Sequence, residues 1–124
     1  MNAEQLIAAA LASRAKWVDL EGGRRVRVRR PAEHDVRSLL QRDAAGAVIG
    51  LAADLPEAIR YVVGWEGFTE SDFTPAGASD PVPFSAELWA IWVEDNRRDL
   101  ATVAQAVIDA VIAHETARAG IEKN

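Results

Sequence analysis

The stretch from Tyr61 to Trp92 holds most of the large aromatic side chains of this chain: three of the four tryptophans, all three phenylalanines and the only tyrosine. A loop rich in Gly, Pro, Ser and Asp separates two aromatic groups, and no recognisable catalytic arrangement lies among them. Aromatic rings carry large apolar areas, so a folded chain packs them into a core or uses them to bind another protein. The stretch therefore predicts either a corner of the core or a protein-binding surface.

Position along the chain distinguishes the aromatic candidates. Trp89 and Trp92 lie three residues apart on an expected helix, a spacing more typical of a core than of a binding site. Phe68 and Phe73 lie in the expected loop, where burial is harder, and are the first candidates for an exposed binding surface. The full set of predicted protein-binding residues is Trp65, Phe68, Phe73, Phe84, Trp89 and Trp92.

The N-terminal part of the chain predicts a helix followed by a β-hairpin. Residues 2–15 begin with Asn2 as the N-cap and Gln5 three residues later, the pattern of a capping box. Residues 16–30 alternate between apolar and polar side chains around a Gly-Gly pair, which indicates a hairpin.

The alternation favours a hairpin loop with an odd number of residues. A two-residue loop would place Leu20 opposite Arg25, with one of them on the wrong face. A loop at 22–24 would give these cross-strand neighbours: Leu20 with Val26, Val18 with Val28, Glu21 with Arg25, Asp19 with Arg27, and Trp17 with Arg29. A loop at 21–23 keeps the same parity and places Gly23 where a left-handed conformation is usual. Both loops remain possible at this point.

The middle of the chain predicts further helices. Pro31 favours a helix start, because its missing N–H costs nothing in the first turn. Residues 43–53 are small and apolar with two glycines, and they fit either a loose helix or a packed connection. Asp54 predicts an N-cap for another helix, which would end at Gly64 or Gly67.

The C-terminal part predicts a long loop and two more helices. The loop at 67–83 contains three prolines, and loops of this length are often functional or mobile. Ser85 is the expected N-cap of the helix that follows it. Apolar residues then repeat with three–four spacing over about residues 99–119, and Gly120 follows as expected for a helix end.

These patterns predict one domain over residues 1–124, of α+β class and mainly α-helical. It would contain an N-terminal helix, one hairpin at about 16–30, and three to four packed helices with a long loop at about 67–83. The chain has no cysteine, no basic lead-in typical of a signal peptide and no apolar run long enough to span a membrane. The expected location is therefore the cytoplasm.

The sequence offers no arrangement that indicates catalysis, cofactor binding or metal binding. The two histidines, His34 and His114, have no second ligand at a suitable helical spacing. No glycine-rich phosphate loop is present, and the serines lie in no nucleophile motif. We therefore expect no enzyme activity, no catalytic residues, no cofactor and no metal.

The arginine-rich strand RRVRVRR at 24–30 is the main candidate for recognition by charge. Alternation places Arg25, Arg27 and Arg29 on one face, where they form a basic face suited to the phosphates of a nucleic acid. The net charge of −5 disfavours nucleic acid as the main partner. Two alternatives are a solvated face partly neutralised by nearby acids, and a surface for an acidic protein, including a second copy of this chain.

Three segments, in this order, resemble the tail assembly chaperones of long-tailed bacteriophages and prophages. The first is a short N-terminal helix followed by a hairpin that ends in an arginine-rich strand and a short helix start, VRVRRPAEHDVRSLL. The second is VVGWEGFTE at 62–70, and the third is PVPFSAELW at 81–89, which has a proline–phenylalanine–serine step before a helix. The resemblance covers about residues 5–115, within which the segments 44–53 and 71–80 are not diagnostic of the family.

The resemblance implies a non-enzymatic assembly factor. Such proteins coat the helical, aggregation-prone tape measure protein, help to deliver tail tube protein around it, and are absent from the finished particle. Some relatives are also made as a longer frameshifted form, and this chain would match the short one. The implied partners are the tape measure and tail tube proteins, and we also expect self-association into a homo-oligomer, in the host cytoplasm. The alternatives are a structural component of the tail or virion, and a small nucleic-acid-binding protein that uses the arginine strand.

Overall fold

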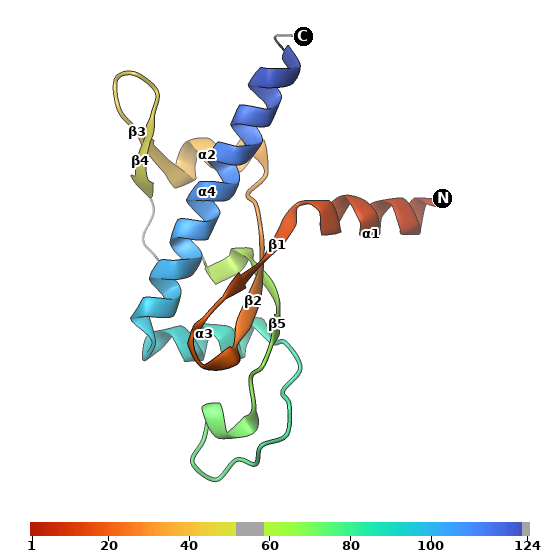
Figure 1. Ribbon diagram of the computed structural model, residues 1–124, viewed down its shortest axis with the longest axis vertical. Helices are drawn as coiled ribbons and strands as arrows, with labels where there is room; N and C mark the ends of the chain where they lie inside the picture. The colour runs from red at the N-terminus through yellow and green to blue at the C-terminus, as the bar shows by residue number, and fades with distance from the viewer. Residues whose placement is uncertain (52–58, 123–124) are drawn as a thin grey trace.

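The long C-terminal helix α4 is the axis along which the other elements are arranged (Figure 1). The computed structural model describes residues 1–51 and 59–122, without the side chains of residues 51 and 122. The α+β, mainly α-helical class and the N-terminal helix and hairpin are confirmed. The helices are α1 (Ala3–Ser13), α2 (Glu33–Leu39), α3 (Ala86–Glu94) and α4 (Arg97–Glu122), with short 3₁₀ turns η1 (Glu21–Gly23) and η3 (Glu70–Asp72). The strands are β1 (Ala15–Asp19), β2 (Arg25–Arg29), β3 (Leu40–Arg42), β4 (Val48–Leu51) and β5 (Val62–Glu66).

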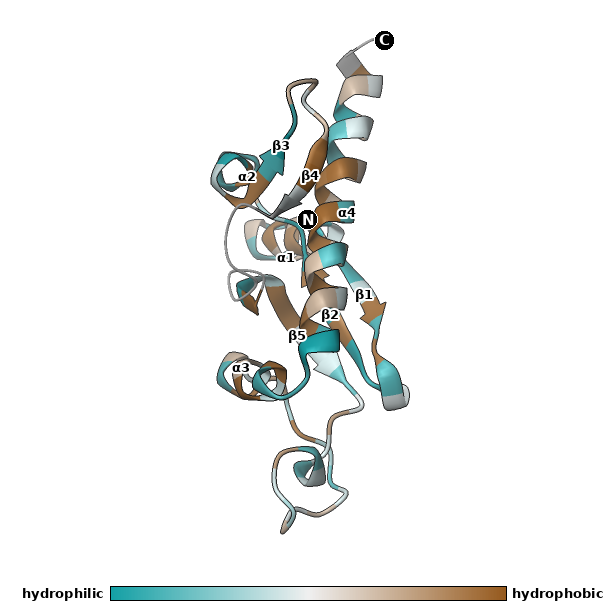
Figure 2. Cartoon of the chain, turned by 90° about the vertical axis from the view of Figure 1, so that its left-hand side faces the viewer, coloured by the Kyte–Doolittle hydropathy of each residue, from teal (hydrophilic) through white to brown (hydrophobic). Residues whose placement is uncertain are grey.

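The hydrophobic core lies between α4, α3 and one face of a three-stranded antiparallel sheet in the order β1-β2-β5. Figure 2 shows hydrophobic segments of β2 and β5 beside α4. The three–four spacing of α4 places one stripe of its side chains in this core, as expected. The buried members of that stripe are Leu100, Val103, Ala104, Val107 and Val111.

The two faces of the sheet differ in chemistry because side chains alternate along each strand. The inner face consists of Val18, Val26, Val28, Val62 and Trp65. The outer face consists of Ala15, Trp17, Asp19, Arg25, Arg27, Arg29, Val63, Gly64 and Glu66. Apolar residues therefore supply the core from one side, while the other side carries arginines and two exposed apolar side chains.

The β1–β2 hairpin has the odd-length loop that the alternation predicts, at residues 21–23. Gly23 has a φ of 77°, in the left-handed region that glycine adopts at little cost. The alternative loop at 22–24 is wrong, because Val18 lies opposite Val26 rather than Val28. Asp19 consequently lies opposite Arg25 instead of Arg27.

The prediction of a helix ending at Gly64 or Gly67 is wrong where the structure describes this segment, because β5 occupies Val62–Glu66. The segment pairs antiparallel with β2, with Trp65 opposite Val26. Val62 and Trp65 are both buried although they are three residues apart, because a register shift opposite Arg27 and Val28 places the extra residue Val63 outside. Pairing with the distant strand β2 thus overrides the local helix signal. The Asp54 cap falls on residues 52–58, outside the described residues.

Residues 40–51 form a second hairpin, β3–β4, instead of the loose helix or packed connection expected for 43–53. The side chain of Asp43 accepts hydrogen bonds of 2.9 Å from the N–H groups of Ala45 and Ala47. Gly46 has a φ of 87° in the same turn. Asp and Gly at these positions close a tight turn, and this local chemistry explains the hairpin. Residues 52 and 53 of the predicted segment lie outside the described residues.

The long loop at 67–83 folds back on itself and has internal structure. The N–H of Glu70 donates to Asp80 at 3.1 Å, and the N–H of Val82 donates to Phe68 at 3.0 Å. Thr69 and Pro81 form an isolated antiparallel bridge, and η3 forms the first turn of the loop. These bonds satisfy the backbone without a regular sheet.

The predicted caps on α1 and α3 are confirmed, but the predicted end of α4 is not. Asn2 and Gln5 form the reciprocal capping box of α1, and Ser85 accepts a hydrogen bond from the N–H of Leu88 at 3.3 Å. Helix α4 continues through Gly120 to Glu122. A glycine costs about 1 kcal/mol inside a helix but does not by itself end one.

Replacing Gly67 by alanine is expected to lower the free energy of unfolding by about 2 kcal/mol. Gly67 has a φ of 86°, and an added Cβ would lie 2.6 Å from the backbone oxygen of Gly23. Chemical denaturation measures the loss. Gly120→Ala is the matched control, because nothing lies within 4 Å of its added Cβ, and we expect it to stabilise by about 0.5 kcal/mol. Equal effects at the two positions would contradict the close approach of the loop to the hairpin turn.

Candidate protein-binding face

The centre of the aromatic cluster is buried and does not form a binding surface. Phe68 is 1% exposed to solvent, Trp89 is 0% exposed and Trp65 is 7% exposed. The expectation of an exposed Phe68 is therefore wrong. The returning segment of the loop covers this ring, and the indole N–H of Trp65 donates to the carbonyl of Val82 at 2.7 Å. Trp65 and Phe68 stack with their centroids 4.3 Å apart.

Three of the aromatic candidates, Phe73, Phe84 and Trp92, are half-buried at the edge of this cluster. Phe84 meets Trp65 edge-on at 5.3 Å, and Phe73 lies 5.9 Å from Trp92. The core-corner interpretation thus accounts for the interior of the cluster. Protein binding through the exposed edges of these three rings stays a prediction.

An ion pair that the sequence analysis did not single out holds this corner together. The guanidinium of Arg24 binds the carboxylate of Asp72 and lies over the ring of Trp92, 4.8 Å from its centroid. Asp72 also accepts a hydrogen bond of 2.8 Å from the N–H of Thr69. The hydrogen bond from Arg24 keeps the pKa of Asp72 below its usual range, against the opposing effect of burial. A capping-box pattern from Thr69 to Asp72 is visible in the sequence, but no local signal indicates the distant Arg24.

The lowered pKa of Asp72 predicts that the stability of the protein falls at acidic pH. Its folded pKa lies below the unfolded value of about 3.9, so the stabilisation is complete above about pH 5 and is lost as pH falls through the folded pKa. Denaturant midpoints measured from about pH 3 to 7 test this. Asp72→Asn is expected to flatten this dependence. If the stability of Asp72→Asn fell with decreasing pH as steeply as that of the wild type, other acidic residues would be the cause of the pH dependence.

Arg25, Arg27 and Arg29 share the outer face of the sheet, as the alternation predicts. Arg25 forms an ion pair with Glu66 on β5 at 2.6 Å and lies over Trp17, 4.2 Å from its ring centroid. The predicted contact of Trp17 with Arg29 is therefore replaced by one with Arg25. The loop at 21–23 shifts the register, so that Trp17 lies directly opposite Arg27 and diagonally from Arg25. One of the three arginines is neutralised in this way.

Arg27 and Arg29 keep their charge on this face without a carboxylate partner among residues 1–51 and 59–122. Trp17 and Val63 lie on the same face and are 41% and 39% exposed. Arginines beside exposed apolar side chains are typical of protein interfaces. We call Trp17, Arg27, Arg29 and Val63 the binding face.

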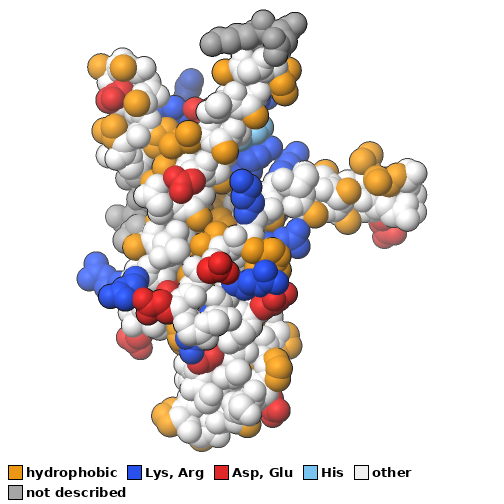
Figure 3. Space-filling model, viewed as in Figure 1, with side chains coloured by type: hydrophobic (Ala, Val, Ile, Leu, Met, Phe, Trp, Pro, Cys, Tyr) orange, Lys and Arg blue, Asp and Glu red, His pale blue; other side chains and the backbone are white. Residues whose placement is uncertain are grey.

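Helix α1 projects from the start of β1 away from the body of the molecule (Figure 1). None of its side chains is buried, and Leu6, Ile7 and Leu11 are 59%, 59% and 44% exposed. A shallow groove of about 190 Å³ joins the base of this helix to the binding face. Figure 3 shows hydrophobic side chains along the projecting helix and basic side chains where it meets the body. The spacing of these apolar residues places them on one stripe of the helix, but it does not indicate that the stripe faces solvent.

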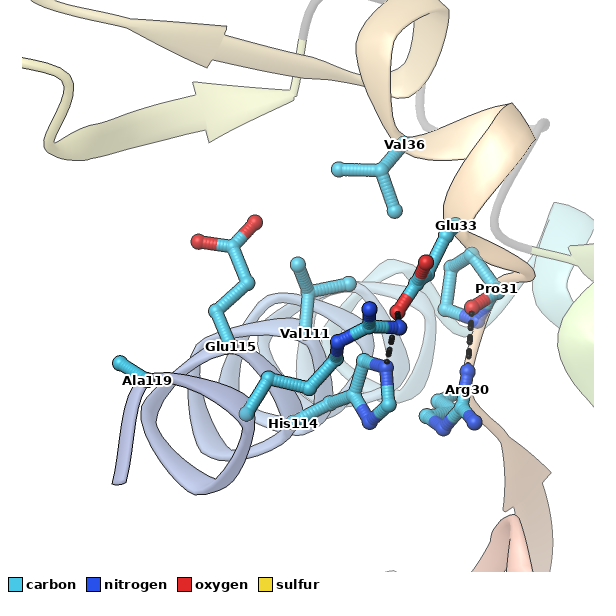
Figure 4. A pocket seen from close by; sticks show the side chains of 9 residues that line it. Arg30, Pro31, Glu33, Val36, Val111, His114, Glu115 and Ala119 are labelled. Carbon is cyan, nitrogen blue, oxygen red and sulfur yellow. Dashed lines mark hydrogen bonds and ion pairs between the residues drawn. The ribbon is translucent and has the colours of Figure 1, made fainter. Parts of the chain in front are cut away.

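A separate polar cluster joins α2 to the C-terminal half of α4 beside a pocket of about 320 Å³ (Figure 4). Glu33 interacts with Nε2 of His114 at 2.8 Å and with Arg118 at 2.5 Å. Hydrogen bonds from His114 and then Arg118 lower the pKa of Glu33. The other histidine, His34, lies 3.5 Å from Asp35. These contacts are those of a partly exposed ion-pair network that ties two helices together.

The described part of the chain contains neither a cluster of metal ligands nor a helix that could span a membrane. No group of three or more His, Cys, Asp or Glu side chains there could hold a metal ion. None of the helices there combines the length and apolar character that crossing a membrane requires. Comparison with known proteins gives no match to a protein family, to a curated protein or to a solved structure.

Proposed function

We propose that this chain is a non-enzymatic tail assembly chaperone of a long-tailed bacteriophage or prophage. It binds the tape measure protein through the binding face in the host cytoplasm. The observation that carries the proposal is the exposure of Trp17 and Val63 beside Arg27 and Arg29, which have no carboxylate partner among the described residues. The three segments that resemble this chaperone family support the same function, and they contain most of β2, all of β5 and the start of α3.

The chemistry of the binding face suits an amphipathic helix with acidic residues along the edge of its apolar stripe. Trp17 on β1 and Val63 on β5 provide apolar area on either side of Arg27 on the central strand. A guanidinium forms paired hydrogen bonds with a carboxylate, which favours Asp and Glu on the partner. A long helical tape measure protein offers such stripes repeatedly along its length.

Repeated weak binding is the mode that a coat around a long partner requires. The binding face is small, so the affinity of one copy is modest. Many copies on one partner nevertheless cover its apolar stripes, and each copy can be displaced when tail tube protein arrives. Release of this kind explains how a chaperone of this type leaves no copy in the particle.

Co-expression with a tape measure protein of a long-tailed bacteriophage or prophage is the experiment that tests the proposal. The wild-type chain is expected to co-purify with it and to increase its soluble fraction. Val63→Asp is expected to reduce the co-purified amount roughly five- to tenfold, because it places an acid among the apolar contacts. Ile91→Asp is the matched control, since Ile91 is an exposed apolar residue of α3 outside the binding face. A tape measure protein that stays insoluble with the wild-type chain would refute the proposal.

A second candidate function, nucleic-acid binding, is favoured by one observation. Arg27 and Arg29 on β2 lack carboxylate partners among the described residues and face the same side. Binding of double-stranded DNA that weakens steeply with salt would support this function. Absence of binding at about 50 mM salt would exclude it, because phosphate contacts are strongest at low ionic strength.

The other alternative is a structural component of the tail or virion. It differs from the chaperone in that the chain remains in the finished particle. Mass spectrometry of purified particles distinguishes the two. The chaperone is absent from finished particles, whereas a tail component is recovered at a fixed ratio to the tube protein.

A further inference from the structure

The projecting helix α1 has an uncovered apolar stripe that its own chain does not bury. Leu6, Ile7 and Leu11 share this stripe and are exposed. An isolated helix of 11 residues is marginally stable in water even with a good N-cap, because most helix stability comes from packing an apolar face. Something therefore covers α1 in the functional protein.

Charges at the two ends of the stripe indicate what covers it. Glu4 lies in the first turn of α1 and Arg14 is its C-cap residue, and neither side chain has an ion-pair partner among the residues described. The two residues are ten positions apart, roughly 15 Å along the helix axis. An antiparallel copy of α1, centred near Ala9, would bring Glu4 of each chain beside Arg14 of the other.

We propose that two copies of this chain associate through an antiparallel pair of α1 helices related by a twofold axis. Ile7 of one copy then packs near Leu11 of the other, and the small Ala10 near the centre allows close approach of the two helices. The two Glu4–Arg14 pairs set the register, and the antiparallel helix dipoles favour the same orientation. This dimer goes beyond the proposed function, because its contacts are made by α1 and not by the four residues of the binding face.

Sedimentation equilibrium of the full chain alone, from roughly 1 to 500 µM, tests the dimer. The paired stripes bury a small area, so the expected dissociation constant is micromolar. Ile7→Glu is expected to raise it at least tenfold. Ala9→Glu is the matched control, since Ala9 lies two residues away and so about 160° round the helix, and it should leave the constant within about twofold of wild type. A wild-type chain that stays monomeric throughout, or an Ile7→Glu variant that associates like wild type, would overturn the proposal.

Charge reversal tests the register independently. Glu4→Arg and Arg14→Glu should each weaken association, because each places like charges across the twofold axis. The double variant should recover it, because the two ion pairs re-form with opposite polarity. Recovery cannot arise from better helix formation, because the double variant places both charges against the helix dipole. A double variant that associates more weakly than either single variant would overturn the antiparallel pairing. These measurements need no tape measure protein, so their failure leaves the proposed chaperone function standing.

Discussion

Replacing Trp89 by alanine is expected to lower the free energy of unfolding by about 4 kcal/mol. Trp89 is fully buried on α3 and meets Phe68 edge-on, with ring centroids 6.4 Å apart. Truncation would leave a large cavity between α3 and the loop at 67–83, which the surrounding backbone cannot fill. Denaturant unfolding followed by circular dichroism measures the loss.

Two further variants determine whether the lost side-chain volume alone explains the reduced stability of Trp89→Ala. The Nε1 of Trp89 is buried without a hydrogen-bond partner among the described residues. Trp89→Phe should therefore cost only about 1–2 kcal/mol, since no hydrogen bond is lost. Trp17→Ala, which removes a tryptophan 41% exposed on the outer face, should cost less than about 1 kcal/mol. If Trp17→Ala lowered the free energy of unfolding as much as Trp89→Ala, the assignment of Trp89 to the core and of Trp17 to the exposed outer face would be wrong.

Replacing Asp72 by alanine is expected to cost about 3 kcal/mol at neutral pH. The variant leaves the guanidinium of Arg24 beside Trp92 and Phe68 without its carboxylate, in a site where both partners are mostly shielded from water. It also removes the acceptor for the N–H of Thr69 at the start of η3. The loss combines an unpaired charge with a lost cap, and equilibrium denaturation measures it.

Asp80→Ala is the matched control for this loss. Asp80 belongs to the same loop but is exposed, and its backbone carbonyl, not its carboxylate, accepts the bond from Glu70. We expect a change within about 0.5 kcal/mol. A small effect of Asp72→Ala, comparable to that of Asp80→Ala, would show that the Arg24–Asp72 pair does not hold the loop to the hairpin.

Local signals account for the elements that the sequence predicts correctly. The capping box of α1, the Ser85 cap of α3 and the periodic stripe of α4 each depend on residues within a few positions of one another. The odd-length hairpin loop also follows locally, because alternation and the Gly22-Gly23 pair lie within a single unit. Such features can be predicted from the sequence because they do not depend on contacts with residues far along the chain.

Distant contacts account for the elements that it misses. β5 is a strand because Val62–Glu66 pairs with β2, which is more than thirty residues earlier in the chain. Phe68 is buried because the loop folds back over it, anchored by Arg24 through Asp72. Arg27 and Arg29 were visible as a basic face from alternation alone, whereas the exposed stripe of α1 depends on the direction in which the helix leaves the body.

The mass of the complex purified after co-expression with the tape measure protein tests the central claim most directly. Light scattering on that complex gives the number of copies of this chain on each partner. We expect a soluble complex with several copies on each tape measure protein, and fewer copies for Val63→Asp than for Ile91→Asp. A soluble tape measure protein without any copies of this chain, or equal copy numbers in the two variants, would contradict binding through the outer face of the sheet.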